Sequence, residues 1–165
     1  KMVVPFAMLL NLASVAGAKD KDGLWGFIKR YAPEASPETH PDLDQAAGFA
    51  VRYFHDFVAP KRAFRLPNDQ ERAAIEDLAA RLRALPDQDL HLTFEDPSEG
   101  LQTLVFAVGK DHGFENLRDW FTALYEVLLG ASQGPRFGGF IALYGVQETV
   151  ALIGHALAGE FVSQG

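Results

Sequence analysis

Residues 134–145 read Gly-Pro-Arg-Phe-Gly-Gly-Phe-Ile-Ala-Leu-Tyr-Gly. Three glycines, one proline and one arginine stand ahead of an apolar segment that is typical of a buried helix. Glycine and proline at this density fix a turn and let two backbones approach closely. Because Arg136 lies within this constrained turn, its guanidinium can be aimed either at helix-end carbonyls or at a partner.

The rest of the chain carries helical periodicity on both sides of this segment. Apolar residues recur at helical spacing, and proline, glycine or capping residues separate the repeats. No convincing strand alternation and no internal repeat are present. The sequence therefore predicts an all-α helical bundle of about seven or eight helices. The expected helices cover residues 4–17, 24–31, 43–59, 68–85, 98–113, 116–130 and 147–161.

Three local patterns give sharper expectations. Asn68, followed by Glu71, has the form of a capping box. The third helix is expected to carry Tyr53 and Phe57 on one apolar face and to end before Pro60. Residues 86–97 are polar and acidic apart from a short alternating patch, so they are expected to form a loop, with Ser98 capping the next helix.

Composition fits one soluble globular domain of 165 residues. The chain has no cysteine, which excludes disulfides and thiolate metal sites, and its net charge of −7 lowers the expectation of a nucleic-acid partner. An apolar run after Lys1 imitates a secretory signal, but Pro5 and Asn11 interrupt it, and it is too short to span a membrane. We expect a buried first helix, no membrane association, and a fragment of a longer protein.

Catalytic signatures are absent from the sequence. It has no phosphate-binding glycine loop, no zinc-protease motif and no nucleophile elbow, and its five histidines are scattered singly. We therefore expect no catalytic residue and no metal site in these 165 residues.

Basic residues gather near aromatic ones in a way that suits an unpaired RNA loop, where cations meet phosphates and flat groups meet bases. Each also has a structural interpretation, as a solvated charge, a helix-end cation or a core ring. The candidate binding residues are Arg52, Lys61, Arg62, Arg65, Arg118, Arg136 and Phe137.

The chain resembles the C-terminal region of the bacterial class I lysyl-tRNA synthetases. The resemblance rests on residues 4–14 (VPFAMLLNLAS), 120–130 (WFTALYEVLLG), 133–138 (QGPRFG) and 140–145 (FIALYG). The last of these, with the helix after it, also resembles the end of glutamyl-tRNA synthetases.

This resemblance implies a single helical anticodon-binding domain, an α-helix cage, over residues 1–165. It implies that the partner is the anticodon stem-loop of lysine tRNA and that the parent enzyme is cytoplasmic and joins lysine to its tRNA with ATP. The Rossmann domain that binds ATP would lie upstream, so this fragment would hold no cofactor. Two alternatives stay open: a helical protein-interaction domain, exported if the apolar start is a signal, and the equivalent domain of a glutamate enzyme.

Overall fold

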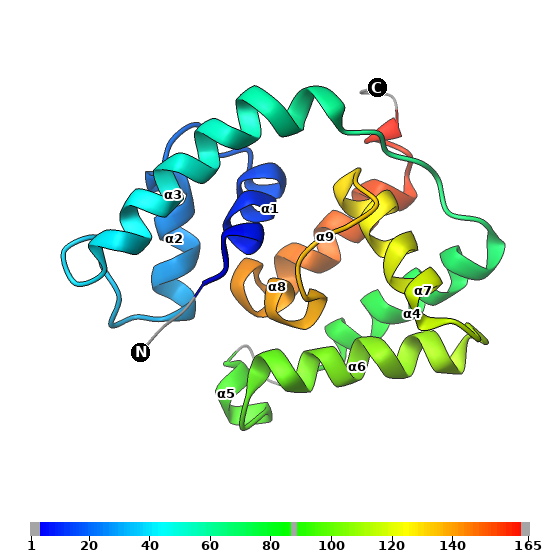
Figure 1. Ribbon diagram of the computed structural model, residues 1–165. Helices are drawn as coiled ribbons and strands as arrows, with labels where there is room; N and C mark the ends of the chain where they lie inside the picture. The colour runs from blue at the N-terminus through cyan, green and yellow to red at the C-terminus, as the bar shows by residue number, and fades with distance from the viewer. Residues whose placement is uncertain (1–3, 87–88, 163–165) are drawn as a thin grey trace. The chain divides into compact units, whose positions relative to one another are not determined.

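The computed structural model describes residues 4–86 and 89–162. In these residues the chain forms nine α-helices and no strand, which confirms the all-α prediction (Figure 1). The chain divides into two compact units, Lys1–Arg62 and Ala63–Gly165, and each is described by itself below.

The first unit contains three helices and two short helical turns. These are α1 (Phe6–Ala16), α2 (Asp22–Tyr31), α3 (Pro41–Tyr53), the π-helical turn η1 (Phe54–Val58) and the 3-10 turn η2 (Ala59–Lys61). Helix α1 packs against α2 and α3, and it ends at Gly17, whose left-handed φ of 62° favours glycine. All three helices contribute fully buried side chains, including Leu12, Ile28 and Ala50.

Polar contacts fix the first unit around these apolar residues. The indole N–H of Trp25 donates to Asp44 at 2.9 Å, and the other oxygen of Asp44 accepts from Lys21 at 2.6 Å. The ring nitrogen Nε2 of His55 lies 2.9 Å from the carbonyl oxygen of Ala18. These contacts tie the α1–α2 connection to α3 and η1.

The second unit contains the remaining helices. They are α4 (Asp69–Arg83), α5 (Leu90–Thr93), α6 (Pro97–Asp111), α7 (Leu117–Leu124), the π-helical turn η3 (Tyr125–Leu129), α8 (Phe137–Tyr144) and α9 (Val146–Leu157). Helices α6 and α8 form an extensive contact, and α4 packs against α9. Consecutive helices α8 and α9 bend by 108° at Gly145, where φ is 118° and ψ is 142°.

Glycine allows the backbones of α6 and α8 to come close together. A Cβ atom on Gly138 would lie 2.4 Å from the backbone nitrogen of Gln102 and 2.5 Å from the carbonyl oxygen of Ser98. The N–H of Gly138 instead donates to the side-chain oxygen of Gln102 at 2.6 Å. The expectation of a close backbone approach in the glycine-rich segment is thereby confirmed.

The predicted helix boundaries are correct in part. The capping box of Asn68 and Glu71 is confirmed, since each side chain accepts the other residue's backbone N–H. The loop expected over residues 86–97 instead contains the short helix α5; residues 87 and 88 lie outside the described residues. Asp96, not Ser98, caps α6, because Pro97 already occupies the first helical position.

The end of the third helix also departs from the prediction. Helical turns continue through Pro60 to Lys61, and Tyr53 and Phe57, expected on one apolar face, have exposed side chains. The π-helical turn explains part of this difference, because it widens the helix and changes which residues share a face.

Candidate nucleic-acid interface

Arg136 stands at the N-terminal boundary of α8 and is exposed to solvent. Its guanidinium donates to Glu99 on α6 at 2.9 Å, and it caps no helix-end carbonyl among the residues that the structure describes. The side chains of Arg136 and Glu99 are 52% and 61% exposed, so the ion pair contributes no more than about 1 kcal/mol to stability. Arg136 therefore remains accessible to an anionic partner that competes with Glu99.

The glycine-rich turn before Arg136 is packed from the inside. The hydroxyl of Tyr125 donates to the carbonyl of Pro135 at 2.7 Å, and the ring of Tyr125 covers the position where Gly134 would carry a side chain. The backbone carbonyl of Gly130 accepts from the N–H of Ala63 at 2.9 Å. The turn is thus anchored, and Arg136 is its exposed end.

Phe137 is a core residue and not a surface contact. Its ring is fully buried and lies against the rings of Tyr125 and Phe140, with centroids 6.2 and 5.7 Å away. The expected direct contact of Phe137 with tRNA is corrected on this ground, because a base could reach the ring only if the core opened.

Arg65 is engaged inside the second unit. Its guanidinium donates to both oxygens of Glu71, at 2.7 and 3.1 Å, and to Glu126 at 2.6 Å. Two carboxylates raise the pKa of Arg65 and neutralise its charge locally. Arg65 thus forms a clasp between the start of α4 and η3, and a phosphate would have to compete with two carboxylates for it.

Arg62 is held within the first unit. Its guanidinium lies 5.0 Å from the ring centroid of Phe54 and donates to the hydroxyl of Ser14 at 3.2 Å. Partial burial lowers the pKa of Arg62. A cation over an aromatic face is a stabilising arrangement, so its structural role has direct support from the geometry.

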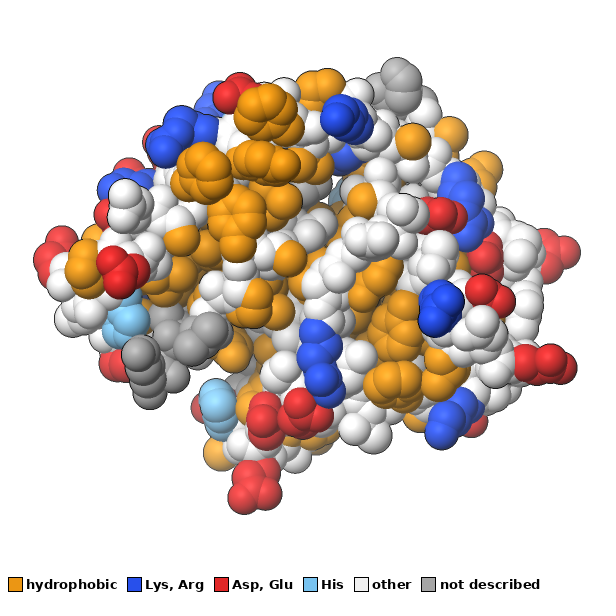
Figure 2. Space-filling view, viewed as in Figure 1, with side chains coloured by type: hydrophobic (Ala, Val, Ile, Leu, Met, Phe, Trp, Pro, Cys, Tyr) orange, Lys and Arg blue, Asp and Glu red, His pale blue; other side chains and the backbone are white. Residues whose placement is uncertain are grey.

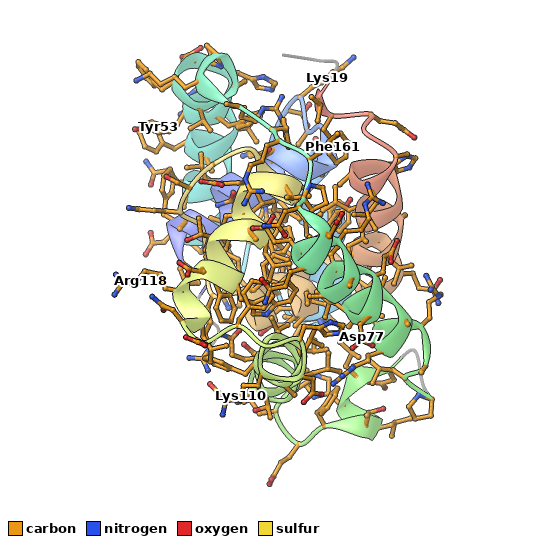
Figure 3. All side chains as sticks on the ribbon, turned by 90° about the vertical axis from the view of Figure 1, so that its right-hand side faces the viewer. Lys19, Tyr53, Asp77, Lys110, Arg118 and Phe161 are labelled. Carbon is orange, nitrogen blue, oxygen red and sulfur yellow. The ribbon has the colours of Figure 1, made fainter. Side chains whose placement is uncertain are left out.

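Three of the sequence-predicted cations have exposed side chains that make no hydrogen bond or ion pair with any residue that the structure describes. Arg52 lies in the last turn of α3, and Lys61 ends η2. Arg118 lies in the first turn of α7, and Figure 3 shows its side chain pointing away from the ribbon. Arg52 and Lys61 belong to the first unit and Arg118 to the second.

Sequence reasoning missed Lys19, which belongs beside Arg52. Both line a hollow of about 520 Å³ between the α1–α2 connection and α3, together with Lys21 and the carboxylates of Asp20 and Asp44. Lys21 is paired with Asp44, whereas Lys19 makes no ion pair with a described residue. Residues 19–22 alternate Lys and Asp, so the sequence around Lys19 has no net positive charge and did not mark it as part of a basic cluster. Only the fold places Lys19 near Arg52.

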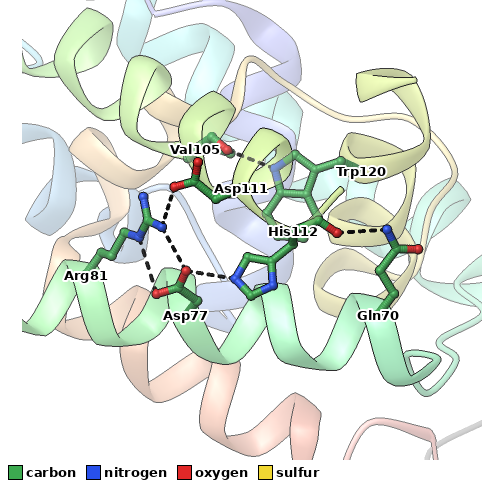
Figure 4. A network of polar contacts seen from close by, with 7 residues as sticks. All are labelled: Gln70, Asp77, Arg81, Val105, Asp111, His112 and Trp120. Carbon is green, nitrogen blue, oxygen red and sulfur yellow. Dashed lines mark hydrogen bonds and ion pairs between the residues drawn. The ribbon is translucent and has the colours of Figure 1, made fainter. Parts of the chain in front are cut away.

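The polar network that most resembles a catalytic constellation joins α4 to the end of α6 (Figure 4). Arg81 donates to Asp77 at 2.9 Å and to Asp111 at 2.8 Å, and Nε2 of His112 lies 2.8 Å from Asp77. Arg81 and His112 lower the pKa of the Asp77 carboxyl through these hydrogen bonds. Each carboxylate is already engaged by a cation, so the network acts as an inter-helix clamp. No group of three metal-ligating side chains occurs among residues 4–86 and 89–162.

The chain aligns over most of its length with known ligases. A lysine–tRNA ligase from Roseobacter denitrificans is 63% identical over 164 residues, which cover 98% of this chain and 29% of that protein. Lysine–tRNA ligases from Rickettsia felis and Rickettsia bellii are 41% and 43% identical over 150 residues, covering 91% of this chain and 27% of each ligase. The chain is homologous to one region of lysine–tRNA ligases.

This region spans 27–29% of the length of the ligases to which it is related. No protein-family model matches the chain, and no solved structure matches it. Within the described residues no single helix is long and apolar enough to cross a membrane; α8 and α9 together have the length and composition, but they are sharply bent.

Charge is divided unevenly over this ligase-related region. The first unit contains eight Lys and Arg against seven Asp and Glu, whereas the second contains seven against fifteen. The net charge of the whole chain therefore conceals a first unit that is close to neutral. Because anionic RNA is repelled by an acidic surface, this unit is the electrostatically better one for phosphate contacts.

Proposed function

We propose that the chain is the tRNA-recognising region of a class I lysyl-tRNA synthetase and that it contacts the anticodon stem-loop of lysine tRNA. The observation that carries this proposal is the 63% identity to a lysine–tRNA ligase over nearly the whole chain. The lysine name of the relatives favours this assignment over the glutamate alternative.

The class I assignment and the anticodon role draw on the sequence resemblance, and the described site is compatible with both. In this proposal the region recognises the tRNA, while the rest of the synthetase would bind ATP and lysine and join lysine to its tRNA in the cytoplasm. This region would itself need no metal or cofactor.

Phosphate contacts are assigned to the exposed cations. Arg52 and Lys61 would bind the RNA backbone from the first unit, with Lys19 beside Arg52 at the edge of the hollow. Arg118 and Arg136 would add contacts from the second unit. Phosphate contacts position an RNA without reading its bases, so base discrimination would come from polar and backbone groups nearby.

The proposal is tested by titrating the full-length synthetase with labelled lysine-tRNA transcript and with a transcript whose anticodon is substituted. We expect preferential, salt-sensitive binding to the native anticodon. Equal binding of both transcripts would contradict an anticodon-reading role.

Arg136→Ala tests one contact directly. We expect binding of lysine tRNA to weaken by about three- to tenfold, because a single exposed cation is lost. The circular dichroism and melting temperature should stay nearly unchanged, because the ion pair with Glu99 is exposed. Lys110→Ala removes an exposed cation from α6 that lies outside the proposed set and serves as the control. A large loss of stability in Arg136→Ala would assign that arginine to structure instead.

A further inference from the structure

Four aromatic rings form an exposed cluster in the first unit. Phe6 comes from α1, Phe49 and Tyr53 come from α3, and Phe57 comes from η1. We call these four residues the aromatic cluster. Their ring centroids lie 5.6 Å apart for Phe6–Phe49, 6.1 Å for Phe6–Tyr53 and 5.1 Å for Tyr53–Phe57. Figure 2 shows large hydrophobic side chains gathered on the surface over α1 and α3.

The exposure of this cluster is unusual for a surface. Phe49 and Phe57 are 51% and 57% exposed, and the other two rings are more than a third exposed. Single exposed apolar residues are common, but contiguous aromatic side chains on one face mark an interaction site. The helical spacing of Phe49 and Tyr53 in α3 explains how the chain aligns these two rings, since residues four apart lie one above the other, and Phe57 follows them in η1.

The geometry of the rings favours an apolar protein surface over RNA bases as the occupant. A base-stacking platform presents a free, flat ring face. In the aromatic cluster the rings are tilted against one another, at 36° for Phe6–Phe49, 78° for Phe6–Tyr53 and 48° for Tyr53–Phe57. The rings therefore present a mixed surface of edges and partly covered faces, which is how side chains meet in a protein core.

The length of the related ligases indicates where such a protein surface would come from. This chain corresponds to only 27–29% of their length. We propose that the aromatic cluster is an intramolecular interface, covered by a part of the same synthetase polypeptide that lies outside these 165 residues. This inference rests on the proposed function, because that function places the chain in a longer synthetase.

Photo-crosslinking in the full-length synthetase tests the inference. The crosslinking amino acid p-benzoylphenylalanine replaces Phe57, and in a control protein it replaces Leu92, an exposed apolar residue of the second unit outside the cluster. After irradiation with and without lysine tRNA, the attached peptides are identified by mass spectrometry. We expect position 57 to attach, within one polypeptide, to peptides outside residues 1–165, with a yield that does not depend on protein concentration. Position 92 should not attach to the same peptides.

Four other results would overturn the inference: attachment to residues 63–165, attachment to a second copy with concentration-dependent yield, attachment to tRNA, or no attachment at position 57. Titration of the same preparations with lysine tRNA tests the recognition function separately from the interface at the aromatic cluster. Retained anticodon-dependent binding without the expected crosslink would reject the interface alone. The expected crosslink without anticodon-dependent binding would support the interface and reject the recognition role.

Discussion

A single hydrogen atom in place of a side chain at Gly138 decides how closely α6 and α8 can pack. A methyl group there would collide with backbone atoms of Gln102 and Ser98, which cannot rotate away as a flexible side chain can. We predict that Gly138→Ala lowers the free energy of unfolding by about 2–3 kcal/mol, because the two helices must separate. Gly154→Ala is the matched control, since a Cβ there meets nothing within 4 Å. In the interior of α9 it should stabilise the protein by about 0.5–1 kcal/mol. Chemical denaturation of both variants measures the difference, and equal effects would contradict the packing role of Gly138.

The start of α4 depends on a buried carboxylate with two kinds of partner. Glu71 accepts from the N–H of Asn68 and pairs with Arg65, and the Arg65 guanidinium lowers its pKa. A carboxyl whose pKa is lower in the folded state stabilises above its unfolded pKa, and this contribution is lost as the pH falls through the folded pKa. We predict that Arg65→Met lowers the free energy of unfolding by about 1–2 kcal/mol at neutral pH, because Glu71 keeps its charge but loses its cation.

The Arg65→Met variant should also lose stability less steeply as the pH falls, because the pKa of Glu71 is no longer lowered by the guanidinium. Arg83→Met, near the other end of α4, is the control, and denaturation at pH 7 and at pH 3–4 checks both statements. An unchanged acid profile in Arg65→Met would contradict this role of the pair.

Helical periodicity was sufficient to predict most elements and insufficient to predict their surfaces. Capping and breaking residues located α4 and the end of η3 at Gly130, because those signals are local. Tyr53 and Phe57 belong to the apolar face that periodicity predicts, and both are exposed, because periodicity shows that a face is apolar and cannot show what covers it. For the candidate site, the sequence likewise identified the basic residues but could not show which of them are exposed. Whether an arginine is exposed, as Arg52 is, or clasped by distant carboxylates, as Arg65 is, depends on residues up to 61 positions away in the chain.

At the scale of the whole molecule, the uneven division of charge predicts how salt affects binding. Removing one phosphate contact should reduce the slope of log affinity against log salt by about one. We predict that Arg52→Ala with Lys61→Ala reduces this slope more than Arg118→Ala with Arg136→Ala, because acidic groups in the second unit already weaken its attraction for RNA. Titration of the full-length synthetase with lysine tRNA at several salt concentrations measures the slopes. A larger reduction from the second pair would place the main phosphate contacts in the second unit.

The packed interior of the glycine-rich turn also bears on how members of a protein family diverge. Gly134 and Gly138 are constrained by Tyr125 and by the backbone of α6, and Phe137 by the surrounding core, so any change at these positions must be matched by neighbours. Exposed cations such as Arg52 and Arg118 can be replaced without a matching change in neighbouring residues. Selection can therefore exchange the surface charges while the turn is inherited intact. Two relatives that keep this turn should therefore also keep its packing, while the exposed cations around it can differ from one to the other.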